Sequence, residues 1–442
     1  MTRLVFQQFY LDCLSHASYL VGDRHTGRAV VVDPQRDIGG YLDAARDAGL
    51  LIERVIETHV HADFLSGHLE LAEATGARIS YGSAAQVDFP IDPLDDGTRV
   101  SLGGVDLEIM HTPGHTPESI CVVVREHPDA APYGVLTGDT LFIGDVGRPD
   151  LLGANGWSAE DLARALYRST RERLLTLPDA TRVFPAHGAG SACGKSLSTE
   201  TSSTIGEQRT ANYALAPMSE DEFVHAVCDG QSIAPMYFAF ASHRNRENRP
   251  TFHEDLPVPI VDSLDGVTVL DTRDPDDFAR GHVAGAINVG LDGRFADLTG
   301  QVLRFDAPIV LVCEPGRAEE ARNRLARIGF DRVLGRWDKP GDVTTRRLSP
   351  SDLESTTARL VDVRAAGEVE SAGTIPGALH VPLTELLKRL DELDPAEPTV
   401  VYCAGGFRSS VAASVLRANG FTDVADLAGG YNAWRDARVE TV

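Results

Sequence analysis

The sequence is poor in basic residues and lacks long apolar runs. Lysine and arginine total 41 against 65 acidic residues, which gives a formal net charge of −24. A chain this acidic repels phosphate backbones and anionic membrane surfaces, so we expect no nucleic-acid or membrane partner. Apolar stretches stay well short of the roughly 18 residues needed to span a bilayer, and polar residues interrupt the N-terminal apolar run. We therefore predict neither a signal peptide nor a membrane span, and expect a cytoplasmic protein.

Paired cysteines are also lacking. The six cysteines are scattered along the chain without a CxxC pair, which excludes a disulfide framework or a structural zinc site of the usual spacing. We expect free thiols at Cys13, Cys121, Cys193, Cys228, Cys313 and Cys403.

The order of apolar and polar segments predicts several domains. The 442 residues, 43% of them hydrophobic, suffice for more than one core. Short β-rich runs alternate with amphipathic segments at first, which predicts an α/β domain with two layers of sheet. A stretch rich in charge, Asn and Pro follows, and beyond it the sequence repeats with an offset of about 90 residues. The predicted parts are an α/β domain at 1–240, a linker at 241–258, and two copies of one small α/β domain at 259–350 and 351–442.

Histidine and aspartate follow the predicted strands of the first domain. The stretch "ETHVHADFLSGH" comes directly after an apolar run and contains His59, His61 and Asp63. Three further residues follow other strand-like runs: His115, Asp139 and His187. Ligand sites gather where strands end in loops, so we expect these residues on one rim. Imidazole with carboxylate suits zinc or iron, whereas His68, further along, is expected to be structural.

The motifs "THVHAD", "TPGHTPES", "TGDTLF" and "FPAHG", in this order, resemble the metallo-β-lactamase superfamily, which implies a four-layer αβ/βα sandwich with metal at the strand-end rim. The usual motif HxHxDH ends here in Phe64, where members with two metals have a histidine ligand. One metal ion is therefore the better expectation.

The stretches "GDVGRPDLL" and "PAHGAGSACGKSLSTE" resemble the persulfide dioxygenase branch of that superfamily. The resemblance implies one Fe(II) per chain, with zinc as a substitute, held by His59, His115 and Asp139. It implies that His61, Asp63 and His187 orient the ligands or a bound water. The substrates would be a thiol persulfide and O₂, and the products sulfite and free thiol.

Residues near the predicted rim suggest substrate contacts. Arg148 follows the metal loop and is a candidate for binding a carboxylate of the thiol carrier. Cys193 lies six residues after His187, and Lys195 beside it would favour its thiolate. Cys193 is therefore a candidate for a reactive or regulatory thiol.

The two repeats each place a cysteine after an apolar strand. In the last copy Cys403 opens a loop formed by Ala404, Gly405, Gly406 and Phe407 before Arg408. Backbone N–H groups of such a glycine-rich loop, with the arginine, favour a thiolate. In the central copy Cys313 and Arg317 are separated by three residues that include Glu314 and Pro315. Proline lacks an N–H group and glutamate adds negative charge, which argues against a loop that stabilises a thiolate.

With "VDVR" and "LAGGYNAW" around this loop, residues 351–442 resemble a rhodanese domain, a sulfurtransferase. The resemblance implies sulfane-sulfur transfer by Cys403 and Arg408, with thiosulfate or sulfite as a further partner, and a central copy that is a degenerate spacer. We also expect a homo-oligomer. The alternatives are a glyoxalase II-like zinc thioester hydrolase fused to a sulfurtransferase, and a non-catalytic sulfur carrier.

Overall fold

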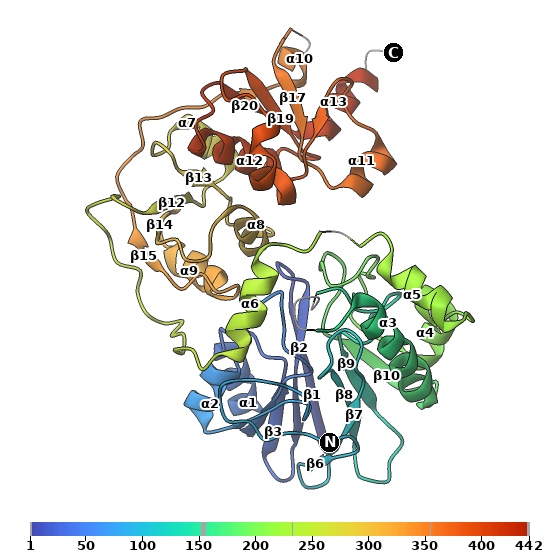
Figure 1. The fold of residues 1–442 in the computed structure, drawn as a ribbon. Helices are drawn as coiled ribbons and strands as arrows, with labels where there is room; N and C mark the ends of the chain where they lie inside the picture. Colours follow the sequence, from blue (N-terminus) through green and yellow to red (C-terminus); the bar gives the residue numbers. More distant parts are fainter. Residues whose placement is uncertain (1, 152–155, 232, 354, 440–442) are drawn as a thin grey trace. The chain divides into compact units, whose positions relative to one another are not determined.

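The computed structural model describes residues 2–151, 156–231, 233–353 and 355–439. These fall into two compact units, Met1–His253 with Arg327–Gly329, and Glu254–Ala326 with Phe330–Val442. Both units mix helices with sheets, as the sequence predicts (Figure 1). Within the described ranges, no helix has the length and apolar character that crossing a membrane requires.

The first unit contains two sheets. The first has the order β1-β2-β3-β4-β5, with antiparallel pairing up to β3 and parallel pairing from there on. Its strands are β1 (Leu4–Leu11), β2 (His16–Asp23), β3 (Arg28–Val32), β4 (Leu51–Ile56) and β5 (Arg78–Ser80). The second has the order β11-β10-β9-β8-β7-β6, in which only β9 and β10 pair in parallel. Its strands are β6 (Arg99–Ser101), β7 (Asp106–His111), β8 (Ile120–Arg125), β9 (Gly134–Gly138), β10 (Arg182–Pro185) and β11 (Ser203–Thr204).

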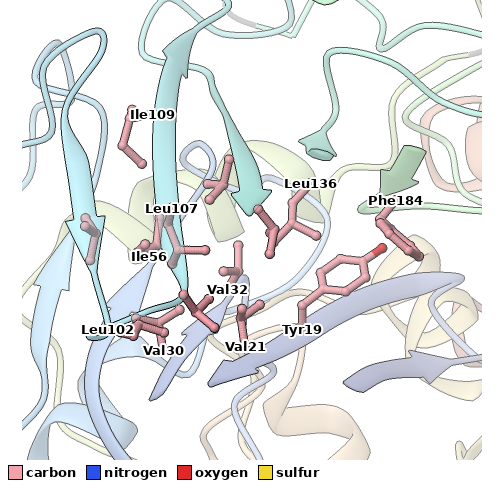
Figure 2. Packing of buried hydrophobic residues seen from close by; sticks show 14 of the residues in the cluster. Tyr19, Val21, Val30, Val32, Ile56, Leu102, Leu107, Ile109, Leu136 and Phe184 are labelled. Atoms are coloured by element: carbon pink, nitrogen blue, oxygen red, sulfur yellow. The ribbon is translucent and has the colours of Figure 1, made fainter. Parts of the chain in front are cut away.

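The main core lies between these sheets. Branched aliphatic and aromatic side chains of both sheets pack there, among them Val30, Ile56, Leu107 and Phe184 (Figure 2). Such residues suit a pleated, buried surface. Helices cover the outer faces: α1 (Gly39–Ala48), α2 (His68–Thr75), α3 (Ala159–Arg168), α4 (Ile205–Ala211) and α5 (Glu220–Cys228). The expected αβ/βα sandwich is confirmed.

Residues predicted as a linker include a helix of the first unit. α6 (Tyr237–Arg246) crosses the boundary that the sequence predicts between the first domain and a linker beginning at residue 241. Its Asn245 side chain donates to the carbonyls of His61 at 2.9 Å and Phe64 at 2.7 Å, and accepts from the Ser66 N–H at 3.0 Å. Composition did not reveal this helix, because its contacts are with residues about 180 positions away.

The segment after α6 is also anchored in the first unit. Glu70 is buried and accepts from Arg36 at 3.0 Å and from Arg249 at 2.6 Å. Burial by itself would raise the pKa of Glu70, but the two guanidinium groups hold it below its ordinary value.

The second unit contains two parallel sheets, one for each repeat. The first has the order β13-β12-β14-β15, with β12 (Thr268–Asp271), β13 (Ile287–Asn288), β14 (Ile309–Val312) and β15 (Val333–Arg336). Its helices are α7 (Pro275–Arg280), α8 (Phe295–Val302) and α9 (Ala318–Ala326). The second has the order β16-β20-β19-β17-β18, with β16 (Arg347–Leu348), β17 (Arg359–Asp362), β18 (Leu379–His380), β19 (Thr399–Tyr402) and β20 (Val424–Leu427). Its helices are α10 (Pro350–Leu353), α11 (Ala366–Ala372), α12 (Phe407–Ala418) and α13 (Gly430–Val439).

Candidate functional site

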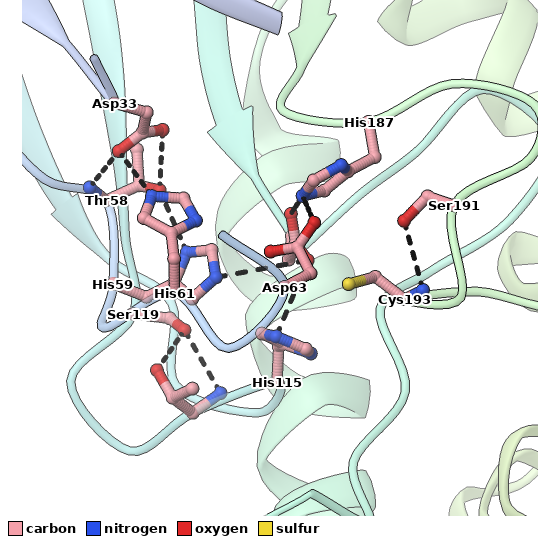
Figure 3. Close-up of polar contacts among 12 residues, drawn as sticks. Asp33, Thr58, His59, His61, Asp63, His115, Ser119, His187, Ser191 and Cys193 are labelled. Atoms are coloured by element: carbon pink, nitrogen blue, oxygen red, sulfur yellow. Dashed lines mark hydrogen bonds and ion pairs between the residues drawn. The ribbon is translucent and has the colours of Figure 1, made fainter. Parts of the chain in front are cut away.

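The predicted metal ligands lie together at strand ends of the first unit. His59 follows β4, His115 follows β7, and Asp139 directly follows β9. Their ligand atoms all lie within 4.8 Å of one another, and all three side chains are buried. The loops after three strands therefore bring two imidazoles and one carboxylate to one point. Figure 3 shows the rings of His59 and His115 at this site.

The geometry of these side chains fits a bound cation. The Nε2 atoms of His59 and His115 lie 3.9 Å and 3.5 Å from Asp139 Oδ2. Both Asp139 oxygens are buried and have no hydrogen-bond partner among the described residues. A buried carboxylate without such partners is costly, and a metal ion bound between these groups would offset that cost.

Hydrogen bonds at the far side of each ring direct Nε2 toward Asp139. His115 Nδ1 lies 2.8 Å from the Arg148 carbonyl oxygen, to which it donates. His59 Nδ1 lies 3.0 Å from the hydroxyl oxygen of Thr58, which donates its own proton to a carboxylate and so accepts from the ring. Burial, and then the neighbouring imidazoles, lower the pKa of His59 well below its ordinary value, so that the ring is neutral, as a metal ligand must be.

A second group of titratable residues adjoins the first. Ligand atoms of His61, Asp63 and His187 also lie within 4.8 Å of one another. His187 Nε2 lies 3.3 Å from Asp63 Oδ2 and 3.5 Å from Asp139 Oδ1, while its Nδ1 faces the Ser15 carbonyl at 3.2 Å. His187 therefore lies directly beside Asp139, one of the candidate ligands.

Phe64 fills the position where HxHxDH would supply another histidine. Its side chain is 1% exposed, and its ring centroid lies 4.5 Å from that of His61 and 4.0 Å from that of His16. His16 is fully buried, with no hydrogen-bond partner for either ring nitrogen among the described residues. Sequence reasoning missed His16 because it looked for polar residues after strands, and His16 begins β2.

Two further carboxylates of the site were missed as well. Asp33 Oδ1 and Glu57 Oε2 lie 3.1 Å and 3.3 Å from His61 Nε2. Burial alone would lower the pKa of His61, but these carboxylates raise it well above its ordinary value. Asp33 also accepts from the backbone and hydroxyl of Thr58 at 2.7 Å and 2.9 Å. A signal was present, because Asp33 follows the apolar strand "RAVVV" just as Asp139 follows its own.

The contacts of Arg148 differ from those predicted. Its guanidinium is buried and binds Asp150 through two hydrogen bonds of 2.6 Å and 2.8 Å. A substrate carboxylate would have to displace Asp150, so the geometry does not support the predicted role. Its backbone carbonyl instead orients His115. The motif that suggested Arg148 ends at Leu152, which lies outside the described residues.

Cys193 lies beside the metal group, but Lys195 does not activate it. The Cys193 Sγ forms a possible ligand group with Asp139 and His187. Burial, and then the carboxylates of Asp63 and Asp139, raise the pKa of the Cys193 thiol well above its ordinary value. The Lys195 ammonium donates to backbone carbonyls, one of them 2.8 Å away, so the expected pairing is corrected.

The cysteine loop of the last copy surrounds a buried sulfur. Cys403 is 1% exposed at the end of β19, and the Gly406 N–H donates to its Sγ at 3.2 Å. Gly406 has a φ of 88°, a left-handed conformation that favours glycine, whereas Gly405 does not share it. Arg408 binds both carboxylate oxygens of Glu368, at 2.6 Å and 2.7 Å, so its position beside the loop is fixed.

The corresponding loop of the central copy has different surroundings. Burial, partly offset by a Thr272 hydrogen bond, raises the pKa of the Cys313 thiol to about 11. Arg317 binds Glu320 at 2.9 Å and Asp292 at 3.0 Å. These contacts favour a neutral thiol at Cys313.

Comparison with known proteins agrees with both parts of the chain. Residues 11–187 match the model of the metallo-β-lactamase superfamily, and residues 260–334 and 350–437 match that of the rhodanese-like domain. "Persulfide dioxygenase ETHE1, mitochondrial" of Bos taurus is 32% identical over 236 residues, which are 52% of this chain and 82% of the relative. The Homo sapiens protein of the same name is 32% identical over 251 residues, or 55% of this chain and 87% of the relative.

A solved structure extends the likeness beyond the first unit. A metallo-β-lactamase from Staphylococcus aureus subsp. aureus COL is 32% identical, with a TM-score of 0.72, and the match covers 76% of this chain and 100% of that one. Fold and site together define a metal-binding domain of the metallo-β-lactamase type followed by rhodanese-like domains. The chain belongs to the metallo-β-lactamase superfamily, in the family of the ETHE1 persulfide dioxygenases.

Proposed function

We propose that this protein is a bifunctional enzyme of sulfur metabolism, which oxidises a low-molecular-weight thiol persulfide with O₂ and transfers sulfane sulfur through Cys403. The observation that carries the proposal is the buried group of His59, His115 and Asp139, whose carboxylate has no hydrogen-bond partner among the described residues. Two histidines and one carboxylate are the ligand set of non-haem Fe(II) oxygenases.

The proposed oxidation converts R–S–SH, O₂ and water into R–SH and sulfite. The S–S bond breaks, the terminal sulfur is oxidised by four electrons to sulfite, and O₂ accepts those electrons. When bound, Fe(II) supplies the redox chemistry that lets O₂ react with the persulfide sulfur.

The protein's own residues hold this ligand set in place. The Arg148 carbonyl and the Thr58 hydroxyl fix the ring orientations of His115 and His59. His187 faces the second oxygen of Asp139 at 3.5 Å and steadies the carboxylate. Phe64 supports a site for one metal, because an apolar ring stands where a further ligand would be needed.

The proposed sulfur transfer uses the loop of Cys403. Thiosulfate would donate its outer sulfur to the Cys403 thiolate, giving Cys403–S–S⁻ and releasing sulfite. The Gly406 N–H stabilises negative charge on the sulfur, and the central Cys313 is held as a neutral thiol by contrast. Since both activities belong to one chain, the persulfide made at one site is available to the other at high effective concentration.

Anaerobic metal analysis followed by O₂ uptake tests the proposal. We expect one iron per chain, and O₂ uptake that starts only when glutathione persulfide is added. Sulfite and glutathione should appear in equal amounts. Two zinc ions per chain, together with hydrolysis of glutathione thioesters, would instead establish the glyoxalase II-like alternative.

A further inference from the structure

A cavity of about 550 Å³ adjoins the Cys403 loop within the second unit. Phe407 and Arg408 of this loop form part of its lining, together with Leu383 of the same copy. The other side is formed by the central copy, through residues at and within α8, among them Arg294 and Leu298. The domain predicted to be a spacer therefore contributes one wall beside the sulfur-transfer loop.

Direct contacts fix this wall against the catalytic helix. The backbone N–H of Asn288 donates to Ser414 Oγ at 3.0 Å, and the Ser410 hydroxyl donates to Asn288 Oδ1 at 2.7 Å. Both serines lie on α12, which begins at Phe407. Gly290 packs so closely on Phe407 that a Cβ there would come within 2.9 Å of the ring. The position of α8 beside the loop is thus set by buried contacts between the copies.

The lining combines apolar side chains with two arginines, Arg294 and Arg408, and two carboxylates. The carboxylates are those of Asp292, which pairs with Arg317, and Asp297, which pairs with Arg294. Leu298, Leu383 and Phe407 supply apolar surface. The Arg294 side chain is 48% exposed and contacts Asp297 through one nitrogen at 2.9 Å. A guanidinium has five N–H donors, so Arg294 retains donors for a ligand carboxylate. A cavity of this size holds an organic molecule rather than a small inorganic anion alone.

We propose that this cavity is the acceptor site of the sulfur transfer, and that it binds a peptide-like thiol through a carboxylate on Arg294. The inference rests on the proposed function and names the class of acceptor. The thiolate of the acceptor attacks the outer sulfur of Cys403–S–SH. A new S–S bond forms in R–S–SH, the bond between the two sulfurs on Cys403 breaks, and Cys403 leaves as a thiolate. No external oxidant or reductant is consumed.

Arg294→Ala in the full-length protein tests the assignment, with thiosulfate as donor and either glutathione or cyanide as acceptor. Cyanide has no carboxylate for Arg294 to bind. We expect the KM for glutathione to rise about tenfold, as for loss of one charge-assisted hydrogen bond, with kcat and the KM for cyanide unchanged. The matched control is Arg304→Ala, which removes an arginine that is 84% exposed, paired with Asp306 and outside the cavity.

A second variant, Thr384→Trp, narrows the cavity from the side of the last copy. It should also weaken the use of glutathione and leave that of cyanide unchanged. Equal effects on both acceptors, or no effect of either variant on glutathione, would refute the acceptor site. Failure of wild-type Cys403 to take up sulfur from thiosulfate would instead overturn the proposed sulfur transfer itself, and the acceptor site with it.

Discussion

Thr58→Val probes how the protein orients a candidate metal ligand. The Thr58 hydroxyl lies 3.0 Å from His59 Nδ1 and 2.9 Å from Asp33 Oδ2. Valine keeps the shape of the side chain, which packs against Gly138, but removes both hydrogen bonds. Asp33 keeps its bond to the Thr58 backbone at 2.7 Å, so the change acts chiefly on the His59 ring.

Loss of a group that orients a metal-binding histidine typically weakens metal binding roughly 10- to 100-fold. This corresponds to about 1.4–2.7 kcal/mol of binding free energy. We expect a decrease in this range in Fe(II) affinity, measured by anaerobic competition with a chelator, while circular dichroism shows a folded protein.

Thr181→Val is the matched control. Thr181 is also buried, but its hydroxyl has no hydrogen-bond partner among the described residues. This variant should bind Fe(II) as the wild type does. If a folded Thr58→Val protein also keeps the wild-type affinity, the hydrogen bond to His59 does not contribute to metal binding, and the reasoning about the ring orientation is wrong.

Three other changes test separate parts of the molecule. Asp139→Ala should abolish persulfide-dependent O₂ uptake and leave thiosulfate sulfur transfer intact, because Cys403 lies in the other unit; joint loss in a folded variant would contradict independent sites. Mass spectrometry after thiosulfate treatment should find the added sulfur on Cys403, and Cys403→Ser but not Cys313→Ser should lose it. Glu70→Gln should lower the melting temperature at pH 7, since breaking a buried ion pair costs about 3–5 kcal/mol. The pKa of Glu70 in the wild type is lowered in the folded state. The stability that its ion pairs contribute is therefore present above the unfolded pKa of about 4.3 and is lost as the pH falls further. The difference in melting temperature between Glu70→Gln and the wild type should therefore shrink in acid. An equal difference at pH 3 would contradict a stabilising role for the ionised Glu70 carboxylate.

Much of the site was predictable because its chemistry is local in the sequence. His59, His115 and Asp139 each follow a strand, and strand ends of a sandwich converge on one rim. The two copies of the small domain were predictable for a similar reason, since equivalent strands and cysteines recur along the chain at a regular spacing.

The remaining features depend on contacts between distant residues. Lys195 stands two positions from Cys193, yet its ammonium donates to the carbonyl of Ala226, on α5. Arg148 is neutralised by Asp150, although the sequence alone suggested an available cation. Side-chain direction, which decides both cases, is not encoded by spacing along the chain.

The anchoring of α6 has a consequence for dissecting the protein into fragments. A truncation at residue 240, the boundary that composition suggests, would delete Asn245 and leave two carbonyls and one N–H of the 61–66 loop without their partners. It would also remove Arg249 from Glu70. Each unsatisfied buried group costs about 1–3 kcal/mol, so such a fragment would be less stable just where the ligands are held. A fragment that keeps these contacts must therefore extend beyond Arg249, and the predicted linker belongs to the first unit as far as His253.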